Sequence, residues 1–278
     1  MKNVFTFLLL LFSLLCNGQS PKLFTTDKEL SSSLINQIYQ DRNGFIWIAT
    51  EDGLNRYDGA KFTIYKHEPN NEHSLAHNFV RTVFEDSKGH LLIGTYIGIQ
   101  MYDPATDNFT PLAKLEDTGE TLESNINSFI ERKNGEIWVS GNVLCKLDIK
   151  DHLLTVRKVD IAVTSPGSLF EDKKQNVWMA KGEEGVYQLT PDNQLTLHLS
   201  KDNGYVKSIC EDQRGNIYVG SIRKGLFIYD KERKTFVPVD LKEKGELPVC
   251  FLYSGPQNEL YIGTDGKGMS VYLSLIHI

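Results

Sequence analysis

Residues 40–50 read Gln-Asp-Arg-Asn-Gly-Phe-Ile-Trp-Ile-Ala-Thr, and this phrase returns in modified form along the chain. Residues 85–95 read Glu-Asp-Ser-Lys-Gly-His-Leu-Leu-Ile-Gly-Thr, and residues 211–221 read Glu-Asp-Gln-Arg-Gly-Asn-Ile-Tyr-Val-Gly-Ser. Six copies align on one large central residue: Trp47, Leu92, Trp138, Trp178, Tyr218 and Tyr261. These positions are 45, 46, 40, 40 and 43 residues apart. A nearly fixed period in this range indicates one supersecondary unit repeated along the chain.

The first repeat predicts four short strands. Alternating or β-rich runs are separated by turn residues, and Gly44 and Asp58-Gly59 supply the conformational freedom that tight turns need. The predicted strands are residues 35–40, 45–50, 54–57 and 61–65. Four antiparallel strands in a unit of about 43 residues form the blade of a β-propeller.

Later repeats keep this order, and no helical period of any length interrupts them. Third strands are expected at residues 99–103, 144–148, 186–189, 226–230 and 269–272, and fourth strands around 109–110 and 235–237. The sixth repeat stops after its third strand, and residues 22–25 resemble an isolated fourth strand. We therefore expect an all-β propeller domain over residues 19–272, with about six blades present and seven in a complete ring, because a shared last blade removes exposed sheet edges.

The repeat Asp-x-x-Gly-x-[Ile/Leu]-Trp-[Ile/Val]-[Gly/Ala]-Thr, followed by Gly-Leu-x-x-Tyr-Asp, resembles the regulator propeller of two-component sensors. The family's Ser-Leu-x-x-Asn phrase also occurs, at residues 74–78, and the resemblance covers residues 22–272. Two repeats depart from the pattern, since Arg132 replaces the usual Asp and residues 173–176 lack the turn glycine. This drift suggests that the strand–turn geometry is kept while individual signature residues are dispensable.

The resemblance implies a function. In that family, seven-bladed periplasmic propellers precede the membrane anchor of hybrid histidine kinases and sense oligosaccharides to regulate polysaccharide-utilisation genes. It implies a small-molecule ligand, an oligosaccharide, and downstream sensor and kinase domains as partners, and it is compatible with a homodimer. Two alternatives stay open: a secreted propeller lyase or glycosidase that acts on polysaccharide, and a purely structural interaction scaffold.

The two ends of the chain carry separate signals. A basic start, a short apolar run and a polar boundary make residues 1–18 resemble a secretory signal peptide, which predicts a periplasmic location. The apolar run of 13 residues is too short for a permanent membrane span. Residues 273–278 read Leu-Ser-Leu-Ile-His-Ile where the repeat predicts a turn, and we expect them to be a non-native tail on a fragment.

Composition narrows the function further. The formal net charge of −6 argues against nucleic acid as a partner, because phosphate binding needs a basic face. Three cysteines follow the signal sequence (Cys145, Cys210 and Cys250), and their odd number and irregular spacing predict buried thiols rather than disulfides. The histidines show no metal-ligand spacing, and no nucleophile motif or phosphate loop is present, so we expect no catalytic residues, cofactor or metal in this segment.

The repeated residues themselves are interpreted as structural. Asp41, Asp86, Asp172 and Asp212 lie one per blade, where their carboxylates are expected to bond turn N–H groups. The tryptophans Trp47, Trp138 and Trp178 are expected to pack between blades, because aromatic rings bury the largest apolar area.

Ligand-binding residues are predicted instead where the repeats differ. One end of the ring is formed by the second-to-third-strand turns and the blade-to-blade connections, and we call this end the loop face. Its residues vary from blade to blade, as a single asymmetric pocket requires, and loops on rigid scaffolds commonly carry binding. The predicted ligand-binding residues are Glu51, Asp52, His77, Asn78, Tyr96, Glu183, Arg223 and Asp265.

Overall fold

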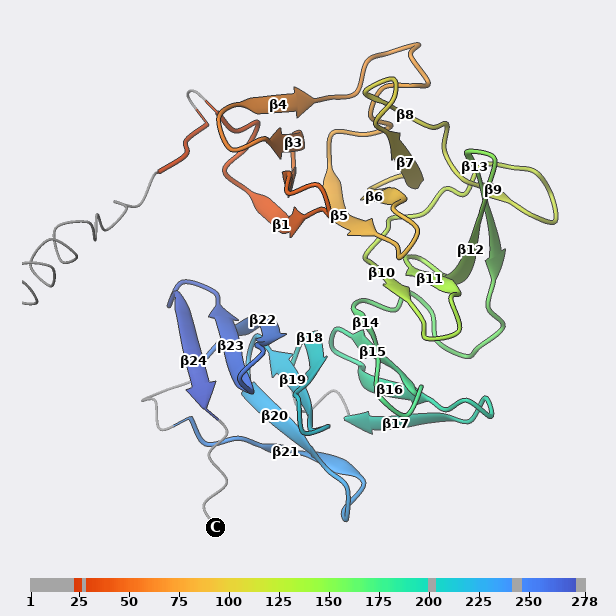
Figure 1. The fold of residues 1–278 in the computed structure, drawn as a ribbon. Helices are drawn as coiled ribbons and strands as arrows, with labels where there is room; N and C mark the ends of the chain where they lie inside the picture. Colours follow the sequence, from red (N-terminus) through yellow and green to blue (C-terminus); the bar gives the residue numbers. More distant parts are fainter. Residues whose placement is uncertain (1–22, 27–28, 200–203, 242–246, 274–278) are drawn as a thin grey trace, which may run out of the picture.

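The computed structural model of the protein describes residues 23–26, 29–199, 204–241 and 247–273. In this part of the chain the regular structure is β, and 24 strands form six sheets around a common axis (Figure 1). The predicted all-β propeller with about six blades is confirmed. No candidate membrane-spanning helix occurs among the described residues. The predicted signal peptide lies outside them.

Each blade is an antiparallel meander that runs from the centre of the ring outward. The first, innermost strands are β1 (Ile35–Gln40), β5 (Val80–Glu85), β10 (Ser128–Glu131), β14 (Leu169–Glu171), β18 (Val206–Glu211) and β22 (Val249–Ser254). The second strands are β2 (Ile46–Thr50), β6 (Leu91–Thr95), β11 (Ile137–Ser140), β15 (Val177–Lys181), β19 (Ile217–Ser221) and β23 (Glu259–Thr264). The third strands are β3 (Gly53–Tyr57), β7 (Ile99–Asp103), β12 (Leu144–Lys150), β16 (Gly185–Leu189), β20 (Gly225–Asp230) and β24 (Met269–Leu273). The fourth strands are β4 (Phe62–Tyr65), β8 (Asn108–Phe109), β13 (Leu153–Lys158), β17 (Leu195–Leu199) and β21 (Thr235–Pro238).

Three details differ from the sequence-based expectations. The third sheet gains a fifth strand, β9 (Lys114–Leu115), which pairs in parallel with β13 and comes from the connection that precedes that blade. The described residues 23–25 form no strand; the Phe24 ring instead packs on Tyr57 and Phe62 of the first blade, with centroids 5.2 and 5.0 Å away. Strand β24 includes Leu273, one residue beyond the predicted end of the domain, and residues 274–278 lie outside the described residues.

The repeated aromatic residues fill the space between blades, as predicted. Trp47 is 1% exposed and its ring contacts Tyr102 of the next blade at a centroid distance of 4.9 Å. Trp178 contacts Tyr229 of its next blade at 5.2 Å. Because the central residues of the first five blades (Trp47, Leu92, Trp138, Trp178 and Tyr218) each pack with residues of the next blade, the cores are built between sheets rather than within one.

The repeated aspartates close the first-to-second-strand turns. In the first blade, Oδ1 of Asp41 accepts the N–H groups of Asn43 and Phe45, and Oδ2 accepts the indole N–H of Trp47. Asp86, Asp172 and Asp212 accept the same two backbone N–H groups in their own turns. All four aspartates are buried, so each carboxylate satisfies turn donors that would otherwise be costly to bury. Their structural role is therefore confirmed.

In the two blades without this aspartate, a glutamate from another position takes its place. In the third blade, Glu136 accepts the indole N–H of Trp138, and the Arg132 guanidinium stacks 4.6 Å from that ring. In the sixth blade, the Glu259 side chain fills the space beside Gly255, where a Cβ would meet its Cδ at 2.4 Å. The strand–turn geometry is thus kept without the signature aspartate, as the sequence indicated, and the carboxylate comes from another position of the same turn.

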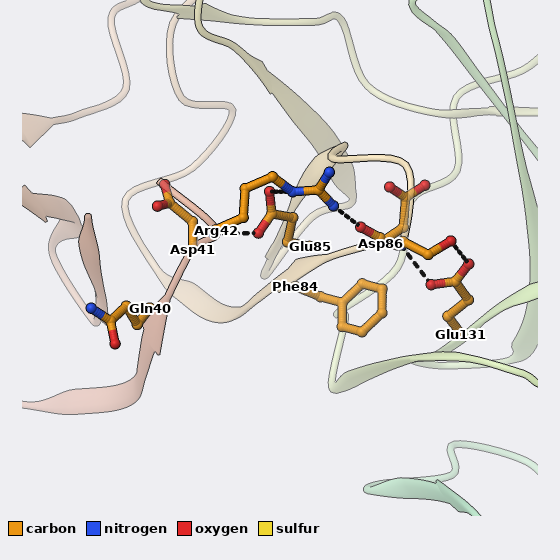
Figure 2. A pocket seen from close by; sticks show the side chains of 8 residues that line it. Gln40, Asp41, Arg42, Phe84, Glu85, Asp86 and Glu131 are labelled. Carbon is orange, nitrogen blue, oxygen red and sulfur yellow. Dashed lines mark hydrogen bonds and ion pairs between the residues drawn. The ribbon is translucent and has the colours of Figure 1, made fainter. Parts of the chain in front are cut away.

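A second set of carboxylates joins neighbouring blades at the same end of the ring. Four innermost strands, β5, β10, β14 and β18, end in a glutamate that accepts a turn N–H from the preceding blade, as Glu85 does from Arg42 at 2.8 Å (Figure 2). The same bond recurs between Ser87 and Glu131, Lys133 and Glu171, and Lys173 and Glu211. We call this end of the ring, with its first-to-second and third-to-fourth-strand turns, the turn face.

The ring is open between its first and sixth blades (Figure 1). Exposed apolar side chains lie on both of these blades. Ile38 of β1 is 62% exposed, whereas its equivalents Val83 and Ile209 are 1% and 8% exposed because a preceding blade covers them. On the other side of the opening, Phe251, Met269 and other residues of the sixth blade are also exposed. Both faces thus have the composition of blade interfaces, and a seventh blade between them stays a prediction.

Candidate functional site

The loop face lies opposite the turn face because successive strands of a meander run in opposite directions. Each predicted binding residue lies on a second-to-third-strand turn or, for His77 and Asn78, on the connection from β4 to β5. The topology therefore places all eight at one end of the ring. Their contacts divide them into three groups, each described below.

The first group joins two blades through Asp52 and Asn78. The Asn78 side chain donates to Oδ1 of Asp52 at 3.1 Å, and its own Oδ1 accepts the N–H of His67. The Lys66 ammonium contacts the other oxygen of Asp52 at 2.6 Å. In addition, the N–H of Gly53 donates to the Asn78 carbonyl at 2.6 Å. Asp52 and Asn78 are thus held in place before any ligand binds, while Glu51 beside them is exposed.

The second group is an aromatic platform. The Tyr96 ring lies 5.6 Å from that of His77 and 6.1 Å from that of Phe79, measured between centroids. Nδ1 of His77 accepts the N–H of Phe79, which fixes the imidazole orientation. Tyr96 is nevertheless 55% exposed. An aromatic ring that is supported on one side and open on the other can stack on the apolar face of a sugar ring.

The third group links the fourth and fifth blades. The Arg223 guanidinium forms an ion pair with Glu183 at 3.1 Å, and both side chains remain more than half exposed. The Tyr205 ring lies against Gly182, where a Cβ would come within 3.0 Å of it. Asp265 lies in the corresponding turn of the sixth blade, and its N–H donates to the Pro248 carbonyl.

Sequence reasoning missed a set of inner residues near this face. The innermost strands of four blades contain a β-bulge, at Asn36, Arg81, Lys207 and Cys250. The Asn36 side chain donates to the Val80 carbonyl, and Arg81 donates to Asn127 of the next blade at 2.8 Å. Each bulge lies eleven residues before the central aromatic or leucine residue of its repeat. An alignment of the repeats could therefore have identified these four bulge positions. They differ in residue type, as the loop-face residues do.

The predicted cysteine chemistry is confirmed in part. Cys145 and Cys210 are buried free thiols, and burial raises the pKa of Cys145 to about 11 and that of Cys210 to about 12. Cys250 is also free but only partly buried, because it lies at the bulge of β22. The two thiols of raised pKa are protonated at neutral pH and are therefore poor nucleophiles.

The turn face also has an open depression, of about 700 Å³, near the inner strands of the first three blades (Figure 2). It is lined by Gln40, Asp41, Arg42, Phe84, Glu85, Asp86, Ser87 and Glu131. The carboxylates in it already accept bonds within and between blades, as Glu85 does from Arg42 and Glu131 does from Ser87. The polar groups that line this depression are thus already used in bonds that hold the blades together. Among the described residues no group of three or more His, Cys, Asp or Glu could hold a metal ion.

The repeats match a known family. The family described as the two component regulator propeller matches residues 29–52, 74–96 and 200–223. The chain carries two-component regulator propeller repeats. The matched segments each contain a predicted binding turn or connection together with the structural strands around it.

Relatives are consistent with this assignment. Histidine kinase P4 of Formosa agariphila is 37% identical over 83 residues, which are 27% of this chain and 6% of that protein. An extracellular domain of a hybrid two-component system from Bacteroides thetaiotaomicron superposes with a TM-score of 0.60 at 18% identity, over 90% of this chain and 41% of that one. A second extracellular domain, of a one-component system from the same organism, gives 0.70 at 18% identity, over 91% and 36%. The regulator propeller described here thus spans less than half the length of each of these relatives.

A structure of different function has the same fold. Virginiamycin B lyase of Staphylococcus aureus superposes with a TM-score of 0.65 at 12% identity, over 93% of this chain and 89% of the lyase. At this level of identity the likeness concerns the fold alone, since one propeller fold hosts many functions.

Proposed function

We propose that this regulator propeller is a ligand-sensing module of a membrane-bound hybrid two-component sensor kinase. In this proposal it lies in the periplasm, binds an oligosaccharide and controls polysaccharide-utilisation genes through kinase domains elsewhere in the parent protein. The segment itself binds without catalysis. The family match and the partial similarity to a histidine kinase support the signalling role.

One observation carries the choice of site. On the turn face the same carboxylate contacts recur in successive blades, and all serve the fold. On the loop face the side chains differ between blades and remain partly exposed, although Asp52 and His77 are already fixed by neighbours. Fixed but exposed polar and aromatic groups bind at a smaller entropic cost than mobile ones.

The charge of the loop face favours a neutral, hydroxyl-rich ligand. The predicted residues include four carboxylates (Glu51, Asp52, Glu183 and Asp265) and one arginine, Arg223, which is already paired. Carboxylates accept hydrogen bonds strongly from hydroxyl groups. Together with the Tyr96 platform, they provide both kinds of contact that a neutral sugar ring needs.

A propeller enzyme is the alternative function, because one propeller fold hosts both binding proteins and enzymes. The two functions predict different fates for the ligand. A sensor releases an oligosaccharide unchanged, whereas a lyase or glycosidase releases shortened products.

Calorimetry with a panel of neutral oligosaccharides tests the proposal, with mass spectrometry of the recovered sugar. We expect one or more sugars to bind and to be recovered intact. Arg223→Ala should weaken binding by about 1–3 kcal/mol if its guanidinium bonds the ligand. Arg233→Ala is a matched control, because Arg233 is 73% exposed and pairs with Asp230 on the turn face. Sugar cleavage, or equal losses in both variants, would contradict the proposal.

A further inference from the structure

A separate cavity of about 650 Å³ lies on the turn face between the fourth and fifth blades. Its floor includes Trp178, Tyr229 and His198, and its rim includes the exposed lysines Lys174, Lys231 and Lys234. None of the predicted loop-face residues lines it. The inference drawn below is therefore independent of the proposed loop-face site.

The corresponding junction between the first and second blades is filled by the protein itself. Arg56, the β3 partner of Trp47, lies among four aromatic rings, with Cζ 5.2–5.7 Å from the centroids of Phe45, Trp47, Tyr65 and Tyr102. Asp107, from the β7–β8 turn, pairs with Arg56 at 3.0 Å. The same Asp107 oxygen accepts the hydroxyl groups of Tyr65 and Tyr102, both at 2.6 Å. One carboxylate thus completes this polar cluster.

The fourth and fifth blades have the same framework without that carboxylate. Gln188 is the β16 partner of Trp178 and thus stands where Arg56 does in the first blade. Lys234 stands where Asp107 does, since each has positive φ and immediately precedes the fourth strand of its blade. A lysine replaces the aspartate, so the position that holds an anion in one junction holds a cation in the other.

The polar groups of this junction are oriented by their neighbours. The His198 ring lies 5.3 Å from that of Trp178, and its Nδ1 lies 3.0 Å from the Lys234 carbonyl oxygen. Its Nε2 lies 2.6 Å from Oε1 of Gln188. The Tyr229 ring packs against His198 at 5.1 Å and is partly exposed. The floor is therefore rigid, aromatic and edged by polar groups.

The charges around the cavity favour an anion. Two carboxylates also line it, but both are engaged: Asp172 accepts turn N–H groups and the indole of Trp178, and Glu211 accepts the N–H of Lys173. The side chains of the three rim lysines extend from exposed turn positions on two different blades. Cations gathered over a partly desolvated floor attract an anionic group, and more strongly at low salt.

We propose that the junction between the fourth and fifth blades binds a carboxylate-bearing sugar ring, a hexuronate unit of an acidic saccharide. Its carboxylate supplies the anion that this junction lacks and contacts Lys234 and the neighbouring lysines. The ring stacks on Tyr229, and its hydroxyl groups bond the Gln188 side chain.

Calorimetry with a linear trimer of galacturonic acid tests the proposal on the full chain. We expect the trimer to bind. The neutral galactose trimer, which lacks the carboxylate, and acetate, which lacks the sugar ring, should each bind at least about tenfold more weakly. The double variant Gln188→Arg/Lys234→Asp rebuilds the self-filled cluster of the first junction and should abolish binding. Lys231→Ala/Lys234→Ala, which changes only exposed side chains, should weaken it about tenfold or more.

Lys150→Ala is the matched control, because Lys150 is an exposed lysine at the outer end of β12, away from the cavity. The Lys150→Ala variant should bind the galacturonate trimer with the same affinity as the native chain. The proposal is overturned if the native chain does not bind the trimer, if the neutral trimer or acetate binds as tightly, or if both double variants keep native affinity while folded by circular dichroism.

Discussion

The two faces of the ring contain similar residue types, but these residues have different roles on each face. On the turn face, carboxylates such as Asp41 and Glu85 are buried or bonded to turns of the same or the next blade, and the pattern repeats around the ring. On the loop face, carboxylates such as Glu51 and Glu183 are exposed and no blade repeats its neighbour. Repetition therefore marks residues that the fold requires. Variation at equivalent positions marks residues that are free to bind.

The largest effect is expected inside a junction. Trp47→Ala removes a fully buried ring and its bond to Asp41, and should reduce the free energy of unfolding by about 3–5 kcal/mol. Urea denaturation followed by circular dichroism measures this. Tyr96→Ala is the loop-face counterpart and should change stability by about 0.5 kcal/mol or less, because its ring is more than half exposed. Equal losses would remove the distinction between the faces.

A smaller loss is expected at the turn aspartates. Asp172→Ala leaves the Trp178 indole and two turn N–H groups without their acceptor, which should cost about 2–3 kcal/mol of unfolding free energy. Asp265→Ala, at an exposed loop-face turn, should have an effect near zero. Thermal unfolding of the two variants, measured side by side, compares their losses of stability. An Asp172→Ala protein as stable as the native chain would show that the carboxylate is dispensable.

The Glu136 carboxylate of the third blade should make the stability of the fold depend on pH. Bonds from Lys146, Trp138 and Asn134 lower the pKa of Glu136 from 4.5 to about 2. A carboxyl whose pKa is lower in the folded state stabilises the fold above pH 4.5, and that contribution is lost as the pH falls from 4.5 toward 2. Because the side chain is one-third exposed, we expect only about 1 kcal/mol.

Glu136→Gln provides the comparison for this pH effect. It keeps the shape of the side chain but removes the titration, so its stability should fall less steeply than that of the native protein between pH 4.5 and pH 2. Denaturation midpoints at several pH values measure the two slopes. Identical slopes would mean that Glu136 has no special role in this turn.

Much of the fold could be predicted from the sequence because the period and the turn residues are local signals. The strands of the first blade, the turn aspartates and the inter-blade tryptophans follow directly from them. The relocation of the carboxylate to Glu136 and Glu259 could not be predicted from the sequence, because it depends on which side chain reaches the turn in the folded blade. The ion pair between Glu183 and Arg223 and the cavity at Lys234 likewise depend on how neighbouring blades pack.

Hydrogen–deuterium exchange with a bound neutral oligosaccharide tests the central claim most directly. The experiment compares amides in the loop-face turns with amides in the turn-face turns of the same blades. The account predicts slower exchange on ligand binding at residues 51–53, 96–98 and 222–224, with residues 41–44, 86–89 and 212–215 unchanged. Protection confined to the turn-face segments would contradict it.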